Sequence, residues 1–430
     1  MPPTASAHAK TVQDLVLRLS PPHPHKDRVK AAHKLQELIA ETPDVADLAV
    51  AADGVVPLLA MAGVVERTEE LAPAKGTSAK NAELADSALL ALAEMCGVAQ
   101  MRLEAQGWGI TIVSSSAPGA DLGTANQGDL YFVSEATESV QKEHPLLAGE
   151  GDVPWESRVL FQLQNWITPV KNAEGKMTLP VRVVRHHPSP DDARRVSVLD
   201  VLPEVEEAAM QGAKLDSAGV PAGTYTRIMV LGAWQGVDGF RESEMDMAAP
   251  PGSDLESWPA CTLVGTAILG PGVAAGRVLV AGLGGGNIPA FILHHFPMAH
   301  VECVDHNSNV AAAAEECFSL PVKGKKGKGG GGGCEVHVAE VAEFLSRPEA
   351  AGRYSAILLD VCTREEFPLG LKTEAFFSLV KAALAPGGSS LVAVNAGSDG
   401  GEEELQGVME KVFPKVHAVA DPEGGGGEEG

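Results

Sequence analysis

Apolar residues recur at helical spacing near the start of the chain. In the first segment they lie three and four positions apart: Val12, Leu15, Val16 and Leu19. The segment 29–39 repeats this arrangement, with Leu35, Leu38 and Ile39 on one face. A stripe of this kind indicates an amphipathic helix whose apolar side packs on a core. The pattern therefore predicts helices throughout the N-terminal region.

Helix, short helix, glycine and next helix follow one another twice, around Gly54 and again up to Gly107. This order resembles that of armadillo-type repeats. The two glycines are further apart than one such repeat allows, and a charged loop over residues 65–80 accounts for the excess. Two units are fewer than a free-standing solenoid needs, so a plain helical domain or cap is the alternative. In both cases we expect residues 1–108 to contact a partner and to carry no chemistry.

Short strand-like runs replace the helical pattern from residue 109 onwards. They alternate moderately between apolar and polar positions and are separated by Pro, Gly, Asp and Asn turns. The expected strands cover residues 110–113, 130–133, 158–164, 181–184, 196–199 and 227–231. A helix is expected over residues 200–213. We therefore predict that residues 109–260 form a β-rich connecting region.

From Arg277 onwards apolar strands alternate with amphipathic helices. Strands are expected over residues 278–281, 300–304, 335–338, 355–359 and 389–394, with an additional edge strand over 416–420. Helices are expected over residues 287–296, 308–318, 340–346 and 373–384. This alternation is typical of an α/β domain whose parallel sheet is covered by helices on both faces. We predict a Rossmann-like, doubly wound sheet within residues 261–421.

Two segments are of low complexity. Residues 323–328 consist of four Lys and two Gly and run into the glycines 329–333, which predicts a solvated loop, with contact to an acidic partner as the alternative. The tail 422–430 consists of Pro, Gly and Glu and is expected to be disordered.

The charge of the chain narrows the choice of partners. It carries 57 acidic and 33 basic residues, a net charge of −24. A surface of this sign repels phosphate backbones, so we expect no nucleic-acid partner. Aromatic residues make up only 4% of the chain, which leaves few platforms for stacking bases. An acidic body suits a basic protein surface, so a protein partner is expected.

The six cysteines are scattered and none forms a C-x-x-C pair, as expected of reduced, mostly buried thiols. The N-terminus lacks the apolar core of a secretory signal. The longest stretch without charge, residues 258–276, is rich in Gly and Pro and short for a membrane span. These features predict a cytoplasmic protein that does not associate with membranes.

A glycine-rich turn follows the first strand of the α/β part. Gly282, Gly284 and Gly286 lie between an apolar strand and a helix that begins at Asn287. Glycine allows positive φ and a close approach of the backbone to a ligand. The first amides of the helix then face that ligand. Pro289 fits here because a helix donates no internal hydrogen bond from its first turn.

Acidic residues follow the next three strands. Asp305 lies 19 residues after Gly286, where a carboxylate can accept hydrogen bonds from ribose hydroxyls. The alternative for Asp305 is an N-cap of the next helix. Glu340 follows the third strand, where it can meet an adenine amino group, and Asp360 follows the fourth. This arrangement predicts a nucleotide-cofactor site, and the pattern to this point also fits NAD.

The later landmarks give the α/β part a more specific resemblance. The turn Leu384-Ala-Pro-Gly-Gly388 and the strand after it resemble the seven-strand S-adenosylmethionine-dependent methyltransferases, and more closely their spermidine-synthase-like branch. The branch's protein-amine methyltransferases are also similar. The resemblance covers residues 227–419, and the segment 241–244 is similar to the one that precedes the glycine strand in the branch.

The resemblance implies the cofactor S-adenosylmethionine, and roles for the residues that match. It assigns the glycine turn to Gly282, Gly284 and Gly286, the ribose acid to Asp305, the adenine-side acid to Glu340, where Asp is usual, and the acid after the fourth strand to Asp360. Asp360 would face the transferred group and orient or deprotonate an amine acceptor. Simple hydrogen bonding to the cofactor or the loop is the alternative for Asp360.

The branch contains two chemistries, and the loop after the fourth strand separates them. Spermidine synthases typically read Asp-Ser-Ser-Asp-Pro there, whereas this chain reads Asp360-Val-Cys-Thr-Arg-Glu-Glu-Phe-Pro368. Thr363 replaces the second acid, and Glu365 and Glu366 are displaced. The chain also has only three tyrosines with which to line a polyamine site. Methylation of a protein amine is therefore preferred to aminopropyl transfer.

No metal site is predicted. His186-His187 and His294-His295 are adjacent pairs without a carboxylate or cysteine at metal-binding spacing.

Together, the motifs and the resemblance predict an S-adenosylmethionine-dependent methyltransferase that acts on a protein lysine or N-terminus. A polyamine aminopropyltransferase and an inactive scaffold with a methyltransferase-like fold are the alternatives.

Overall fold

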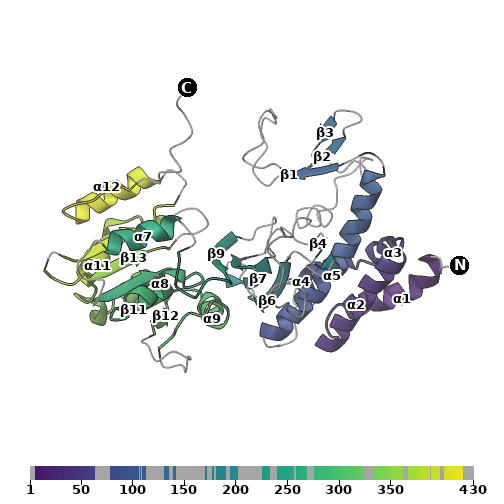
Figure 1. Ribbon diagram of the computed structural model, residues 1–430, viewed down its shortest axis with the longest axis horizontal. Helices are drawn as coiled ribbons and strands as arrows, with labels where there is room; N and C mark the ends of the chain where they lie inside the picture. Colours follow the sequence, from purple (N-terminus) through teal and green to yellow (C-terminus); the bar gives the residue numbers. More distant parts are fainter. Residues whose placement is uncertain are drawn as a thin grey trace. The chain divides into compact units, whose positions relative to one another are not determined.

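The computed structural model describes residues 5–62, 78–105, 107, 109–112, 130–134, 139–141, 170–171, 177–178, 181–189, 194–201, 225–232, 240–255, 258–268, 276–323, 333–361, 367–387, 389–397 and 401–419. The chain forms two compact units (Figure 1). The first contains residues 1–224 and 230–240, and the second contains residues 225–229 and 241–430. The domain boundaries predicted at residues 108 and 260 stay predictions.

The N-terminal part of the first unit is helical, as predicted. Its helices are α1 (Ala5–Arg18), α2 (His25–Glu41), α3 (Val45–Ala51), α4 (Val55–Ala62) and α5 (Ser78–Glu104). The predicted apolar faces are buried, since Val12, Leu19 and Leu35 have no accessible surface. Helix α2 lies beside α5 (Figure 1), and His33 Nε2 is 3.3 Å from Ser87 Oγ in this contact.

The second predicted series of a helix and a short helix is instead one helix. Helix α5 runs for 27 residues without interruption. It contains no proline, and Gly97 is its one glycine, so nothing in the sequence breaks it. The armadillo-like arrangement stays a prediction.

No single helix in the described part of the chain is long and apolar enough to cross a membrane. Helices α3 and α4 meet the length and composition criteria only as a pair, which is bent by 88°.

The described residues that follow α5 are rich in strands, as predicted, and these strands pair antiparallel. They are β1 (Gly109–Ile112), β2 (Leu130–Ser134), β3 (Ser139–Gln141), β4 (Val170–Lys171), β5 (Met177–Thr178), β6 (Val181–His187) and β7 (Val196–Val201). Strands β1, β2 and β3 form one sheet, β4 pairs with β5, and β6 pairs with β7 through a bulge between Val183 and Arg185. The strand predicted over 158–164 lies outside the described residues. The helix predicted over 200–213 is wrong at its start, because Asp200 and Val201 end β7, and its remainder is not described.

The second unit is built on a five-stranded parallel sheet, which confirms the predicted Rossmann-like architecture. The strands are β10 (Arg277–Ala281), β11 (His300–Asp305), β12 (Glu335–Val338), β13 (Ala356–Leu359) and β14 (Leu391–Val394), in the order β12-β11-β10-β13-β14. The chain reverses its direction of progress between β10 and β13. In doubly wound sheets ligands bind at the carboxyl ends of the strands beside such a switch point.

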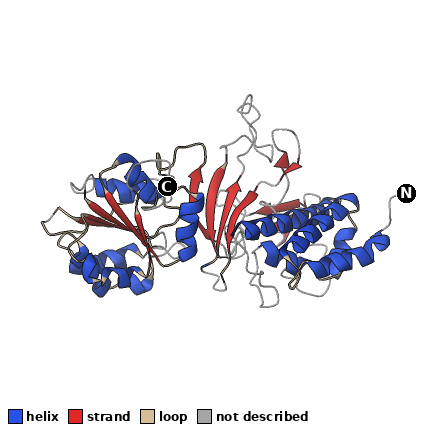
Figure 2. Cartoon of the chain, turned by 90° about the horizontal axis from the view of Figure 1, so that it is seen from below, coloured by secondary structure: helices blue, strands red, loops and turns tan. Residues whose placement is uncertain are grey.

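Helices cover both faces of this sheet (Figure 2). They are α7 (Trp258–Ile268), α8 (Asn287–His295), α9 (Ser308–Cys317), α10 (Val341–Leu345), α11 (Glu374–Ala383) and α12 (Glu402–Val412), with the short 3-10 helices η4 (Pro348–Ala350) and η5 (Leu369–Leu371). The core between the sheet and α11 contains Ile357 and Leu359 of β13 and Phe377 and Val380 of α11, all fully buried. Burial on both faces explains why the central strands β10 and β13 read as continuous apolar runs.

Three features of the second unit differ from the prediction. Helices α7 and α12 were not predicted, and α7 occupies the start of the uncharged stretch. The edge strand predicted over 416–420 is wrong, because residues 416–419 form no strand. Val419 is 64% exposed, so a strand here would have no apolar surface to cover.

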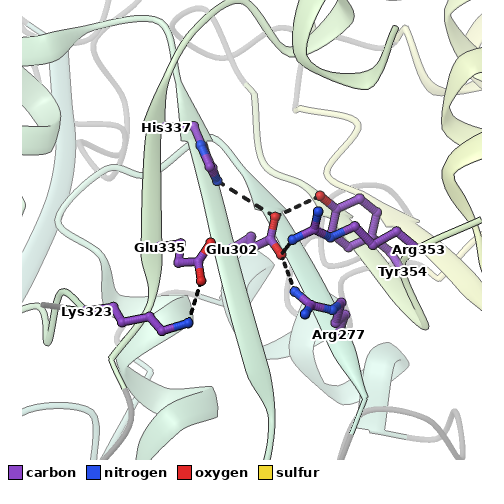
Figure 3. Close-up of polar contacts among 7 residues, drawn as sticks. All are labelled: Arg277, Glu302, Lys323, Glu335, His337, Arg353 and Tyr354. Carbon is purple, nitrogen blue, oxygen red and sulfur yellow. Dashed lines mark hydrogen bonds and ion pairs between the residues drawn. The ribbon is translucent and has the colours of Figure 1, made fainter. Parts of the chain in front are cut away.

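A buried carboxylate ties three strands of the sheet together (Figure 3). Glu302 of β11 accepts hydrogen bonds from Arg277 Nη1 of β10 at 2.7 Å, from Tyr354 Oη at 3.0 Å, and from Arg353. His337 Nε2 of β12 lies 3.7 Å from the same carboxylate. Glu302, Glu335 and His337 are close enough together to hold a metal ion. Two guanidinium groups already occupy the Glu302 carboxylate, so we interpret the group as an ion-pair network.

Replacement of Glu302 by Gln is expected to destabilise the second unit by about 2–3 kcal/mol, because two cations lose a buried counter-ion. The estimate lies below the range for a fully buried pair because Arg277 and Arg353 are partly exposed. Urea denaturation followed by tryptophan fluorescence measures this. The control is Glu343→Gln, which breaks an exposed pair with Arg347 and should cost at most about 0.5 kcal/mol. Equal stabilities of the two variants would refute the structural role of Glu302.

Candidate functional site

The candidate site residues from the sequence analysis all lie at the carboxyl-terminal end of the parallel sheet. They follow the carboxyl ends of adjacent parallel strands, which meet at the same side of the sheet. The glycine turn follows β10, Asp305 ends β11, Glu340 follows β12 and Asp360 follows β13. The glycine turn and Asp360 flank the switch point between β10 and β13.

The glycine turn has the backbone conformation that its sequence predicts. Gly282, Gly284 and Gly286 have φ values of +83°, +48° and +80°. A Cβ atom on Gly282 would overlap the backbone carbonyl oxygen of Asp360. Gly286 caps α8, and its amide donates to the Leu283 carbonyl oxygen at 2.8 Å. Only glycine satisfies both the conformation and the close approach at Gly282.

Asp305 is held by the glycine turn and by the loop that follows it. Its Oδ2 accepts a hydrogen bond from the Leu283 amide at 2.9 Å, and its Oδ1 accepts one from the Asn307 amide at 2.7 Å. Asn307 is the N-cap of α9, so Asp305 is not the helix cap that the sequence left open. A carboxylate accepts about four hydrogen bonds, so capacity remains for two hydroxyl groups. Burial raises the pKa of Asp305, although these two amides oppose the shift.

Glu340 is exposed and forms the N-cap of α10 without a side-chain capping bond. Its negative charge acts on Asp305 and contributes to the raised pKa of that residue. The ends of β11 and β12 therefore present two carboxylates near one another. Their assignment to the ribose and adenine sides of a cofactor stays a prediction.

Asp360 is positioned from two directions. Its amide donates to the Ala281 carbonyl oxygen at 2.8 Å, and its Oδ1 accepts from Asn395 Nδ2 at 2.9 Å. Burial raises the pKa of Asp360, and the bond from Asn395 opposes the rise. No sequence pattern singled out Asn395, which lies one residue beyond β14. Thr363, Glu365 and Glu366, which distinguish this loop from that of spermidine synthases, lie outside the described residues.

A strand that the sequence analysis did not predict lies against the glycine turn. Strands β8 (Thr226–Leu231) and β9 (Phe240–Asp246) are hydrogen-bonded neighbours. Ser243 Oγ of β9 accepts from the Gly285 amide at 2.8 Å, and the Glu244 carbonyl oxygen accepts from Asn287 Nδ2 at 2.6 Å. The segment 241–244, noted for its resemblance alone, is thus part of the site.

Glu242 of β9 is the functional candidate that the sequence reasoning missed. Its Oε1 is 3.7 Å from the position that a Cβ atom on Gly284 would take. Burial raises the pKa of Glu242 to about 8, and the negative charges of Asp360 and Asp305 add to the shift. Asp305 and Asp360 therefore act on Glu242 from two other segments of the chain, a juxtaposition that no local pattern reveals.

Raised carboxyl pKa values predict that the unliganded protein loses stability as the pH rises. The folded state holds protons that the unfolded chain releases, so this contribution is full below about pH 4 and is lost as the pH rises through the folded pKa, up to about 8 for Glu242. Between about pH 5.5 and about pH 8.5 the Tm of the wild type should fall more than that of Glu242→Gln, by about 3 °C or more. Differential scanning fluorimetry in matched buffers measures both slopes. Parallel slopes would contradict the shift.

Comparison with known proteins places these features in context. No protein-family profile matches the chain. The eEF1A lysine and N-terminal methyltransferase of Bos taurus is 26% identical over 149 residues, which cover 33% of this chain and 20% of that protein. The polyamine aminopropyltransferase of Vibrio vulnificus is 28% identical over 113 residues, which cover 26% of this chain and 35% of that protein. Human methyltransferase-like protein 13, solved in complex with SAH, is 21% identical with a TM-score of 0.29, over 37% of this chain and 72% of that one.

These similarities confirm the resemblance to the spermidine-synthase-like branch, because a protein methyltransferase and an aminopropyltransferase are both among the relatives. The chain spans about a fifth of the length of the methyltransferase that it matches, and about a third of the aminopropyltransferase.

Proposed function

We propose that the chain is an S-adenosylmethionine-dependent methyltransferase that acts on an amine of a protein, either a lysine side chain or an N-terminus. The observation that carries the proposal is the arrangement of the glycine turn and the buried Asp305 at the carboxyl-terminal end of the sheet. The Asp305 carboxylate accepts hydrogen bonds from two amides and can accept further ones from a ligand. The similarity to a methyltransferase of protein lysines and N-termini supports the choice of acceptor. The net charge of −24 suits a basic protein surface.

The residues at the carboxyl-terminal end of the sheet fit S-adenosylmethionine. Gly282, Gly284 and Gly286 have positive φ, a conformation that lets the backbone of a turn approach a ligand closely. Helix α8 begins directly after the turn, so its first amides lie at the same end of the sheet. Asp305 would hold the ribose hydroxyls, and Glu340 would lie at the adenine. Bound there, S-adenosylmethionine supplies a methyl group on a positively charged sulfur.

Asp360 would face the transferred group. It is fixed by its own amide and by Asn395, so its carboxylate has a defined direction at the switch point between β10 and β13. An amine acceptor reacts only when it is neutral and held at attack distance. Asp360 would orient the acceptor nitrogen there through a hydrogen bond.

Aminopropyl transfer to a polyamine is the second candidate function, because a polyamine aminopropyltransferase is also among the relatives. The loop that distinguishes the two chemistries begins at Asp360 and continues into residues that the structure does not describe. Direct measurement of ligand preference therefore decides between them.

The test is isothermal titration of the full chain with S-adenosylmethionine, its decarboxylated form and NAD. The proposal expects binding of S-adenosylmethionine with a Kd on the order of 10 μM, and transfer of a labelled methyl group to eEF1A in a second assay. Preference for the decarboxylated form, with turnover of a polyamine, would establish aminopropyl transfer instead. Failure to bind all three ligands would favour an inactive scaffold.

A further inference from the structure

Glu242 differs from the other two carboxylates of the site in its hydrogen bonding. Asp305 accepts two hydrogen bonds and Asp360 accepts one. Within the part of the chain that the structure describes, no hydrogen bond reaches the Glu242 carboxylate. Glu242 is half-buried, and this burial together with the negative charges of Asp360 and Asp305 disfavours its charged form. A carboxyl group whose charged form is disfavoured in this way is suited to take up a proton or to bind a positively charged group.

The position of Glu242 is fixed by its strand. The residues that follow it, Ser243 and Glu244, are bonded to Gly285 and Asn287 at 2.8 Å and 2.6 Å, so β9 is attached to the glycine turn at two points. The Glu242 side chain consequently lies over Gly284, with both Cγ and Oε1 3.7 Å from the position of a Cβ on that glycine. Glu242 is therefore held beside the turn that follows β10, next to the switch point where ligands bind in doubly wound sheets.

We propose that Glu242 accepts the proton of the acceptor ammonium, beside Asp360, and so generates the neutral amine that is methylated. This inference rests on the proposed methyl transfer and extends it. The ammonium N–H bond breaks, its electron pair stays on nitrogen as the lone pair, and the proton forms an O–H bond on Glu242. The group starts as a carboxylate and ends as a neutral carboxylic acid.

The two neighbouring acids explain how one residue performs this role. The charges of Asp305 and Asp360 favour uptake of a proton by Glu242, and they attract an ammonium group to the same place. A positive charge that enters the site has the opposite effect and favours the Glu242 carboxylate. Binding of a cationic ligand should therefore release the proton that Glu242 holds near neutral pH and prepare it to accept another.

Proton release on ligand binding tests this directly, with S-adenosylmethionine as the cationic probe and S-adenosylhomocysteine as its neutral counterpart. Titration at about pH 7 in buffers of different ionisation enthalpy gives the number of protons released. The wild type should release about one proton with the cation and clearly fewer with the neutral ligand. Glu242→Gln, which resembles the neutral acid, should bind the cation about 10-fold more weakly than wild type and release almost no protons. Glu343→Gln, which changes an exposed carboxylate outside the site, should behave as wild type.

Each outcome has a separate meaning. Binding without proton release in the wild type, or equal release in wild type and Glu242→Gln, would overturn the inference and leave the methyltransferase proposal intact. Loss of binding in Glu242→Gln would also overturn it, since Glu242 would then hold the cofactor. If the wild type binds neither ligand, the proposed function itself fails.

The pH profile of methyl transfer to eEF1A provides the second test. The rate of Glu242→Gln should fall by about 100-fold or more and lose the low-pH limb that the wild type shows. Glu242→Asp should restore part of the rate. A profile that is unchanged in shape would contradict proton acceptance by Glu242.

Discussion

Replacement of Gly282 by Ala is expected to abolish binding of S-adenosylmethionine and to destabilise the second unit by about 3 kcal/mol. Gly282 adopts φ +83°, which strains any residue that has a Cβ atom. The new methyl group would also overlap the backbone carbonyl oxygen of Asp360, and a backbone group cannot rotate away as a side chain can. The turn after β10 and the loop after β13 would therefore separate, at the point where the cofactor is proposed to lie.

Two other glycines provide graded comparisons for this prediction. A methyl group on Gly284 meets the Ser243 side chain, which can move, so Gly284→Ala should be the milder variant. A methyl group on Gly407 in α12 meets nothing within 4 Å, and Gly407→Ala should stabilise the helix by about 0.5–1 kcal/mol. Chemical denaturation and isothermal titration of the three variants measure the order. If Gly282→Ala has the same stability and the same affinity for S-adenosylmethionine as Gly407→Ala, the close approach at Gly282 affects neither folding nor binding.

Replacement of Asp305 by Ala is expected to weaken binding of S-adenosylmethionine by at least about 100-fold. Two charge-assisted hydrogen bonds to ribose hydroxyls would be lost, each worth about 1.5–3 kcal/mol. The Leu283 amide would also lose its acceptor, so the glycine turn itself would be less well held. Asp305→Asn keeps an acceptor oxygen but no charge, and it should bind with intermediate affinity.

The stability of these variants separates a binding effect from unfolding. Burial raises the pKa of Asp305, so removal of its carboxylate relieves a cost of desolvation that offsets the lost hydrogen bonds. The Tm of Asp305→Ala should therefore remain within a few degrees of wild type. Asp254→Ala, which removes an exposed carboxylate that accepts from the Leu255 amide, is the matched control and should bind normally. Wild-type affinity in Asp305→Ala would exclude a ribose-binding role.

Local patterns predicted most of the α/β part because its signals lie within short segments. Apolar runs predicted β10 and β13, runs that mix apolar and polar residues predicted β11 and β12, and glycine spacing predicted the turn before α8. The prediction of an edge strand over 416–420 was wrong because a local pattern does not show what surrounds a segment in the fold. Alternating residues form a strand only where a neighbouring strand and a covering layer exist, and Val419 is exposed.

The sequence by itself determined the parallel sheet, the glycine turn and the acids that follow three of its strands, because strand order and turn chemistry are written in contiguous residues. Only the tertiary structure decided the role of β9, the contact of Asn395 with Asp360, and the identity of Asn307 rather than Asp305 as the cap of α9. It also brought Glu242 within the field of Asp305 and Asp360, which lie 63 and 118 residues further along the chain. Charges interact through space at distances of a few ångströms, and the path of the chain through the fold alone determines which charges meet.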